Sequence, residues 1–96
     1  MSDEVILATP RQIRAGRALM DWNQTELAEA ADVGWAPLAR LEQGKGIARR
    51  STILRIQAAL EKGDESGRIE FIPAAGGKLE GVRLLPPLTT EPSGKE

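Results

Sequence analysis

Two sequence patterns that begin a helix lie close together near the N-terminal end of this chain. The first helix must therefore be short, because it ends before the second one begins. Thr9 precedes the first helix and Asn23 precedes the second, and Gln12 and Glu26 stand three residues after these caps. A polar cap followed at this spacing by Gln or Glu is the capping-box pattern, which satisfies two backbone N–H groups reciprocally. The second helix is expected to end near Ala31.

The next segments predict two more helices. Residues 32–34 (Asp-Val-Gly) break the second helix, and a third helix is expected over residues 35–43. Pro37 is compatible with that helix because a proline in the first turn gives up no intrahelical hydrogen bond. Ser51 or Thr52 is expected to cap a fourth helix. Apolar residues recur at helical spacing, and the predicted buried positions are Ile13, Met20, Leu27, Ala28, Ala31, Leu38, Leu41, Ile53, Ile56, Ala59 and Leu60.

From position 68 onward the hydrophobic period changes from helical to extended. Residues 68–72 and 82–85 predict two short strands, joined by the Gly-rich stretch 73–81. Because an isolated hairpin is barely stable in water, this hairpin must pack on the helices or on a partner chain. The expected organisation is an N-terminal tail (1–8), a helical domain (9–63), the hairpin (68–85) and a disordered, proline-containing tail (86–96).

Composition and charge favour a binding protein. Cysteine and histidine are both absent, so the commonest general base and the thiolate metal ligands are missing. No apolar run approaches the ~18 residues of a membrane span, and the acidic start is unlike a signal peptide. Between positions 10 and 62, nine basic against six acidic residues give a net charge of +3, and the remainder carries −4. We expect a cytoplasmic protein with no metal, no cofactor and no catalytic activity, whose basic body permits phosphate binding.

The central segments carry a more specific pattern. Residues 22–28 read Trp-Asn-Gln-Thr-Glu-Leu-Ala, residues 33–34 read Val-Gly, and residues 38–44 read Leu-Ala-Arg-Leu-Glu-Gln-Gly. Two short helices joined by a short turn are typical of a helix-turn-helix. Over about residues 12–60, the chain resembles the phage-repressor-like (XRE, Cro/C1-type) helix-turn-helix family. The resemblance implies a mainly α fold, a compact four-helix lambda-repressor-like bundle followed here by a short C-terminal β-hairpin. It also implies a nucleoid-associated regulator that binds double-stranded DNA.

The resemblance implies roles for individual positions. Gln24 matches a position that contacts a phosphate and supports the reading helix, and Arg17 and Glu42 match a partly buried ion pair. The reading helix of such a protein lies in the major groove. The positions implied to contact DNA are Gln24, Thr25, Trp35, Ala36, Pro37, Arg40, Lys45, Arg49 and Arg50, the last three in a loop along the DNA backbone.

The reading positions carry unusual residues. Base edges are read by hydrogen bonds, which favours Gln, Ser, Thr, Asn or Arg, whereas Trp35, Ala36 and Pro37 stand here. Arg40 alone suits a bidentate contact with guanine, worth ~1–3 kcal/mol of discrimination. Ala36 is suited to touch a thymine methyl group, and Trp35 a sugar or a methyl group. Specific readout is therefore expected to depend on Arg40.

Two functional classes follow from the sequence. The first is a repressor-type regulator acting as a homodimer, because one module of this size covers only a half-site. The second is a protein-interaction module of the same fold, such as an antitoxin or a partner-binding subunit, with Trp35 as its anchor. No catalytic constellation is recognisable, which makes an enzyme the least supported class. The candidate dimer interface is on the hairpin and consists of Ile69, Phe71, Val82 and Leu84.

Overall fold

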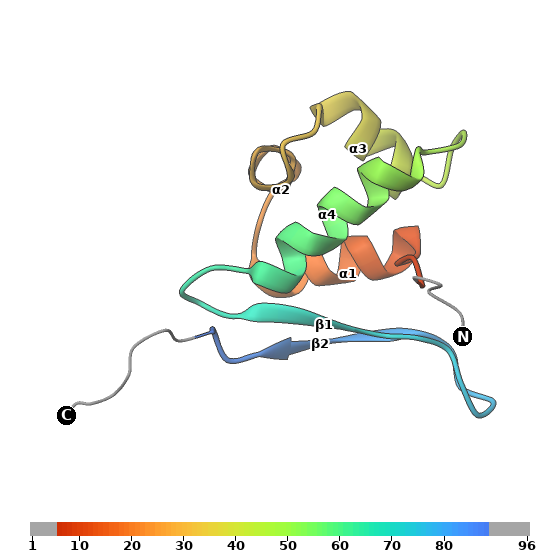
Figure 1. The fold of residues 1–96 in the computed structure, drawn as a ribbon, viewed down its shortest axis with the longest axis vertical. Coiled ribbons are helices and arrows are strands. Elements are labelled where there is room, and N and C mark those ends of the chain that lie inside the picture. Colours follow the sequence, from red (N-terminus) through yellow and green to blue (C-terminus); the bar gives the residue numbers. More distant parts are fainter. Residues whose placement is uncertain (1–5, 89–96) are drawn as a thin grey trace.

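The computed structural model describes residues 6–88 and, within them, four helices followed by one antiparallel hairpin. The chain is mostly helical, and the hairpin lies beneath the helices (Figure 1). Residues 1–5 of the expected N-terminal tail and 89–96 of the expected disordered tail lie outside the described residues. The elements are α1 (Pro10–Met20), α2 (Gln24–Ala31), α3 (Trp35–Glu42), α4 (Arg50–Lys62), β1 (Arg68–Ile72) and β2 (Gly81–Leu85).

Both predicted capping boxes are confirmed. The Thr9 hydroxyl accepts from the Gln12 backbone N–H at 3.1 Å, and the Gln12 side chain accepts from the Thr9 N–H at 3.0 Å. Asn23 and Glu26 make the same reciprocal pair at 2.8 Å each. Helix α1 ends at Asp21, which adopts the left-handed conformation (φ 59°). Two short helices therefore begin where the local sequence predicted them, because their ends are satisfied locally.

The start of α4 differs from the prediction. Arg49, and neither Ser51 nor Thr52, is the residue before the first turn, and no side chain caps this helix. The physical reason is that the Ile53 N–H already bonds to the Arg49 carbonyl at 3.1 Å, which places both hydroxyl residues inside the helix. Arg50, expected in the preceding loop, is the first residue of α4.

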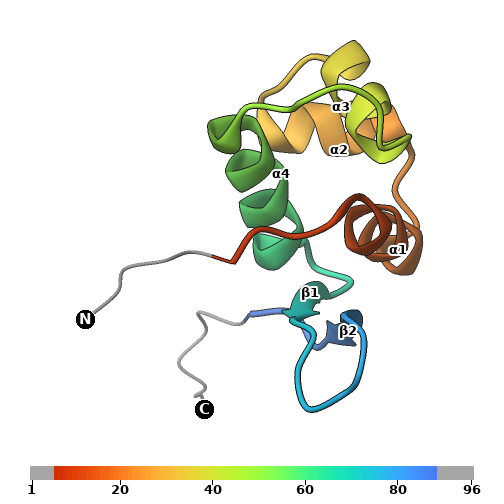
Figure 2. The ribbon, with the colours of Figure 1, turned by 90° about the vertical axis from the view of Figure 1, so that its right-hand side faces the viewer.

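The core lies between the four helices and the hairpin (Figure 2). Of the eleven positions predicted to be buried, ten are buried and the remaining one, Ile53, is partly buried against the same cluster. The predicted helical faces are thus confirmed. No helix within residues 6–88 has the length and apolar character needed to cross a membrane. The largest fully buried side chains are Ile13, Leu27, Leu38, Ile56, Leu60 and Ile69.

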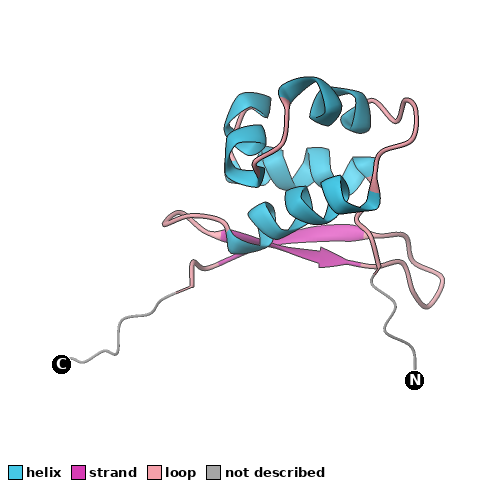
Figure 3. Cartoon of the chain, turned by 45° about the horizontal axis from the view of Figure 1, so that its top comes forward, coloured by secondary structure: helices cyan, strands magenta, loops and turns pink. Residues whose placement is uncertain are grey.

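The hairpin packs on α1 and α4 of the same chain (Figure 3). The register pairs Ile69 with Leu84 and Phe71 with Val82, so these four side chains share one face of the sheet. Ile69 packs close to Gly16 of α1, since a Cβ on that glycine would lie 3.3 Å from the Ile69 side chain. Of the two alternatives in the sequence, packing on the helices is the one that the structure contains.

One buried polar residue ties the end of the hairpin to α1. The Gln12 side-chain amide, 5% exposed, donates to the carbonyls of Ile72 and Gly81 at 3.0 and 2.9 Å. Those two residues face each other across the ladder where the strands leave for the Pro73–Glu80 loop. Gln12 therefore serves both the capping box and the attachment of the hairpin, so all of its amide atoms are satisfied.

Candidate nucleic-acid interface

Helix α3 has one face buried in the core and one face exposed to solvent. Leu38 and Leu41 are buried in the core, whereas Ala36, Pro37 and Arg40 are exposed. Ala36 and Arg40 are one helical turn apart, so they lie on the same side of the helix. This outer face lies at the opposite end of the molecule from the hairpin (Figure 1). We call these three residues together with Trp35 the α3 face.

An ion pair holds α3 against α1, as expected for Arg17 and Glu42. The guanidinium is bidentate: Nε donates to Oε2 and Nη2 to Oε1, both at 2.8 Å. The Glu42 side chain is 3% exposed and that of Arg17 is 23% exposed. The hydrogen bonds to Glu42 raise the pKa of Arg17 above its ordinary value, despite partial burial. Such a fork-shaped contact fixes orientation as well as distance.

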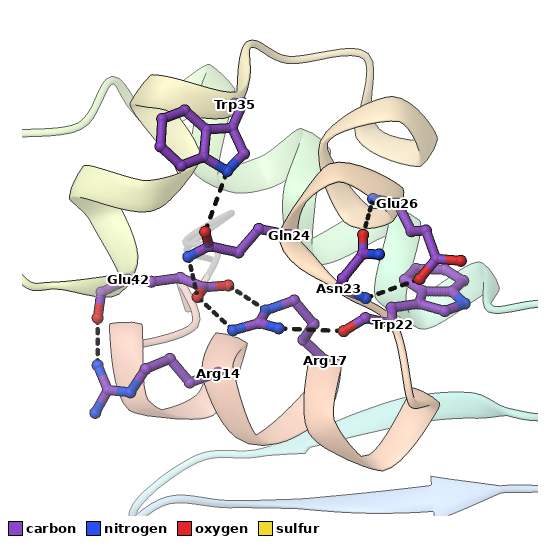
Figure 4. A network of polar contacts seen from close by, with 8 residues as sticks. All are labelled: Arg14, Arg17, Trp22, Asn23, Gln24, Glu26, Trp35 and Glu42. Atoms are coloured by element: carbon purple, nitrogen blue, oxygen red, sulfur yellow. Dashed lines mark hydrogen bonds and ion pairs between the residues drawn. The ribbon is translucent and has the colours of Figure 1, made fainter.

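The Glu42 carboxylate is also connected to the α3 face through two hydrogen bonds in series (Figure 4). The Gln24 amide nitrogen donates to Glu42 Oε1 at 2.9 Å, and the Gln24 amide oxygen accepts from the Trp35 indole N–H at 3.1 Å. Gln24 therefore links the carboxylate at the end of α3 to the indole at its start. The amide nitrogen carries a second hydrogen, so it can donate to a phosphate while both of these bonds are kept.

Arg14 is a member of this network that the sequence reading missed. Its guanidinium donates to the backbone carbonyl of Glu42, at the C-terminal end of α3. Arg17 also donates to the Trp22 carbonyl at 3.1 Å, which links α1 to the start of α2. Cations near a helix C-terminus satisfy its last carbonyls. The spacing of Arg14 from Arg17, almost one turn, was the available signal.

The predicted basic residues follow α3 in the chain, and two of them lie beside the α3 face. Lys45 and Arg49 lie in the connection from α3 to α4, and Arg50 begins α4. Within residues 6–88 no carboxylate pairs with these three or with Arg40. Arg40, Lys45 and Arg49 line one groove with Ala36 and Pro37 of the α3 face.

A shallow groove of about 340 Å³ runs between α3 and this connection. Its lining combines cations with small apolar side chains, and Ile47 at its rim is completely exposed. The Arg40 guanidinium lies against the backbone of Gly46, since a Cβ there would be 3.2 Å from Nη2. The lining residues are Ala36, Pro37, Arg40, Leu41, Lys45, Ile47, Ala48, Arg49 and Thr52.

The remaining predicted site residues lie apart from this groove. Thr25 is exposed in the first turn of α2. Of the hairpin positions, Ile69 is 1% exposed, and Phe71 and Val82 pack partly against the core. Leu84 is 44% exposed. Three of the four residues expected to contact a second copy are thus engaged with the chain's own helices. Only Leu84 offers substantial apolar surface.

No protein-family model matches the chain, and no curated protein matches it. Within residues 6–88 no group of three or more acidic side chains is placed to hold a metal ion.

Proposed function

We propose that this chain is a helix-turn-helix regulator that binds double-stranded DNA in the cytoplasm, with α3 in the major groove. The observation that carries the proposal is the α3 face itself. The inner side of helix α3 is fixed by the Arg17–Glu42 pair, while its outer side presents Arg40, and Lys45 and Arg49 line the same groove. A rigid helix with an exposed arginine and flanking positive charge matches the chemistry of a base edge between two phosphate backbones.

The charge arrangement supports contact with a polyanion. The overall net charge is −1, so non-specific attraction of the whole molecule to DNA is weak. Attraction must instead come from Arg40, Lys45 and Arg49 at the groove and from Arg50 at the start of α4. Phosphate contacts supply most of the non-specific affinity of DNA-binding proteins, and each releases about one counterion.

The connection between α2 and α3 supports the same proposal. Asp32 adopts the left-handed conformation (φ 57°), and its N–H closes α2 by bonding to the Glu29 carbonyl at 3.2 Å. Val33 packs partly against the core. This turn joins two eight-residue helices, and its short length supports the proposal of a helix-turn-helix.

The test uses the full-length chain and fluorescence anisotropy across a salt series. Duplexes selected from a randomised library are compared with scrambled versions, and Arg40→Ala is compared with Arg83→Ala. Arg83 is a matched control because it is an exposed arginine on the hairpin, paired with Glu70. Preference for the selected duplex that Arg40→Ala abolishes and Arg83→Ala preserves is the expected result.

The salt dependence tests the phosphate contacts. Lys45→Ala, Arg49→Ala and Arg50→Ala should each weaken binding about equally to all duplexes and reduce the log–log salt slope by about 1. Affinity that is weak, independent of salt and unaffected by these substitutions would contradict DNA binding.

A second candidate is a protein-interaction module, and one observation favours it. Trp35 is 56% exposed, and Ile47, which lines the groove, is fully exposed. Exposed tryptophan is enriched at interface hot spots. This function predicts a protein partner whose capture is lost with Trp35→Ala and retained with Arg40→Ala, together with no salt-dependent affinity for DNA.

A further inference from the structure

The polar group of Trp35 is already used inside the protein. Its indole N–H donates to Gln24, which is held in turn by Glu42. Indole has no other hydrogen-bonding group, so the exposed part of this ring offers only carbon and hydrogen to a ligand. The network therefore presents a fixed apolar surface at the N-terminal end of α3.

The next two exposed positions are apolar as well. Ala36 offers a methyl group and Pro37 a ring, and both line the groove with Arg40. Gln43 is also exposed, but it is the C-terminal cap that follows α3 and does not belong to the α3 face. Arg40 is thus the one hydrogen-bonding side chain on the α3 face.

Only one pattern on a base edge matches this combination. Guanine presents two acceptors, N7 and O6, which suit an arginine fork, and thymine presents a C5-methyl group, which suits apolar contact. Cytosine and adenine present amino donors in the major groove. Thymine alone presents a methyl group on this edge, so apolar contact is most favourable there.

The spacing limits how far apart the two bases lie. The Cβ atoms of residues one turn apart on a helix are ~5–6 Å apart, and successive bases on a strand are ~3.4 Å apart along the axis. We infer that, if the chain binds DNA as proposed above, the α3 face selects a guanine with a thymine one or two base pairs away. The thymine is recognised through its C5-methyl group.

The Gln24 side chain is a positioning residue for this recognition. It contacts the indole N–H on one side and the buried Glu42 carboxylate on the other. Trp35 is anchored through a side chain that is itself fixed, which reduces the conformational entropy lost when the indole meets a base.

The test replaces single thymines by deoxyuridine in a duplex selected from a randomised library. This exchange removes the C5-methyl group and retains every hydrogen-bonding group of the base. At fixed salt, uridine at the thymine near the guanine should weaken binding roughly fourfold, as expected for one buried methyl group. Uridine outside the half-sites is the matched control and should leave the affinity unchanged. 7-Deazaguanine, which lacks the N7 acceptor, should weaken binding at the neighbouring guanine.

The outcomes separate this inference from the function on which it depends. Salt-dependent binding that is equally tight to thymine and uridine duplexes would overturn methyl recognition and leave DNA binding intact. Selected sites without a thymine one or two base pairs from a guanine would also overturn methyl recognition and leave DNA binding intact. Absence of binding to every duplex would overturn both.

Gln24→Met tests the positioning role, because methionine has similar length and no amide. The variant should lose the preference for thymine over uridine, whereas Arg83→Ala, on the hairpin and paired with Glu70, should retain it. Thermal unfolding establishes that the variant is folded. A folded variant with an undiminished preference would overturn the role of Gln24.

Discussion

At the scale of single residues, Glu42 organises the candidate interface. Its carboxylate accepts hydrogen bonds from Arg17 and Gln24, and its backbone carbonyl accepts one from Arg14. Three helices therefore meet at one side chain that is 3% exposed. A buried charge is tolerated here because every oxygen of the carboxylate is paired.

Glu42→Ala should lower the free energy of unfolding by about 3 kcal/mol, because Arg17 would keep its charge in a partly buried site without the carboxylate. Urea unfolding followed by circular dichroism measures the change. Arg40→Ala is the control, since Arg40 is exposed, and it should change stability by less than about 0.5 kcal/mol. A similar small change for both variants would show that the ion pair contributes little.

Asp64 is a second residue whose contacts predict a measurable effect. Its carboxylate accepts from the Ser66 hydroxyl and backbone N–H at 2.6 and 2.8 Å and from the Trp22 indole N–H at 3.0 Å. The Ser66 hydroxyl is the largest cause that lowers the pKa of Asp64 below its ordinary value of 3.8. A lowered pKa in the folded state means that the ionised form is stabilised by folding.

The stabilising effect of Asp64 should therefore be complete above pH 3.8 and lost as the pH falls through the lower pKa of the folded state. Trp22 fluorescence in a Trp35→Phe background, recorded from neutral to acidic pH, reports the contact. Asp64→Asn is the comparison that isolates this carboxylate from the others. An identical acid transition in both chains would contradict the prediction.

At the scale of elements, the hairpin is part of the domain. Ile69 of β1 is 1% exposed, and its side chain packs against α1 at Gly16, where there is no side chain to block it. Gln12 closes the other end of the hairpin through two backbone carbonyls. A two-stranded sheet that is marginal in isolation is stable here because one face is covered by α1 and α4.

Ile69→Ala should accordingly destabilise the whole domain by about 2–5 kcal/mol, since it removes buried methyl groups and leaves a cavity. Urea unfolding should remain a single transition, because hairpin and helices share one core. Leu84→Ala, on the same sheet face but 44% exposed, is the matched control and should cost much less. Two separate transitions would indicate that the hairpin folds independently.

At the scale of the whole molecule, the α3 face and the hairpin lie at opposite ends (Figure 1). A second copy attached through the hairpin would therefore leave both α3 faces uncovered. This arrangement is compatible with the homodimer proposed from the sequence, although Ile69, Phe71 and Val82 pack on their own helices.

If the hairpin joins two copies, Leu84 is the residue to change. Leu84→Asp should produce monomers in sedimentation velocity experiments while the chain stays folded, because this side chain is 44% exposed. Phe71→Asp is a poorer probe, since Phe71 packs partly against the core and its loss would also destabilise the fold. A Leu84→Asp protein that still sediments as a dimer would exclude this interface.

The amino-acid sequence by itself determined the local features of this protein. The capping boxes at Thr9 and Asn23, the predicted helical faces and the two strands follow from short-range pairing and hydrophobic period. The start of α4 was misplaced because Ser51 and Thr52 are good caps, whereas the first helical hydrogen bond is made to Arg49. The Arg17–Glu42 pair was predicted through the family resemblance and not through spacing.

Tertiary structure alone decided which long-range partners those elements meet. The hydrophobic period of the sequence does not indicate that Gln12 bonds to Ile72 and Gly81. It also does not indicate that the Trp35 indole bonds to Gln24. Residues 68–85 read equally well as a dimer element or as a cover for α1 and α4 until the packing of Ile69 was known. The physical reason is that local propensity acts between neighbours in the chain, whereas side-chain pairing across elements depends on how those elements pack.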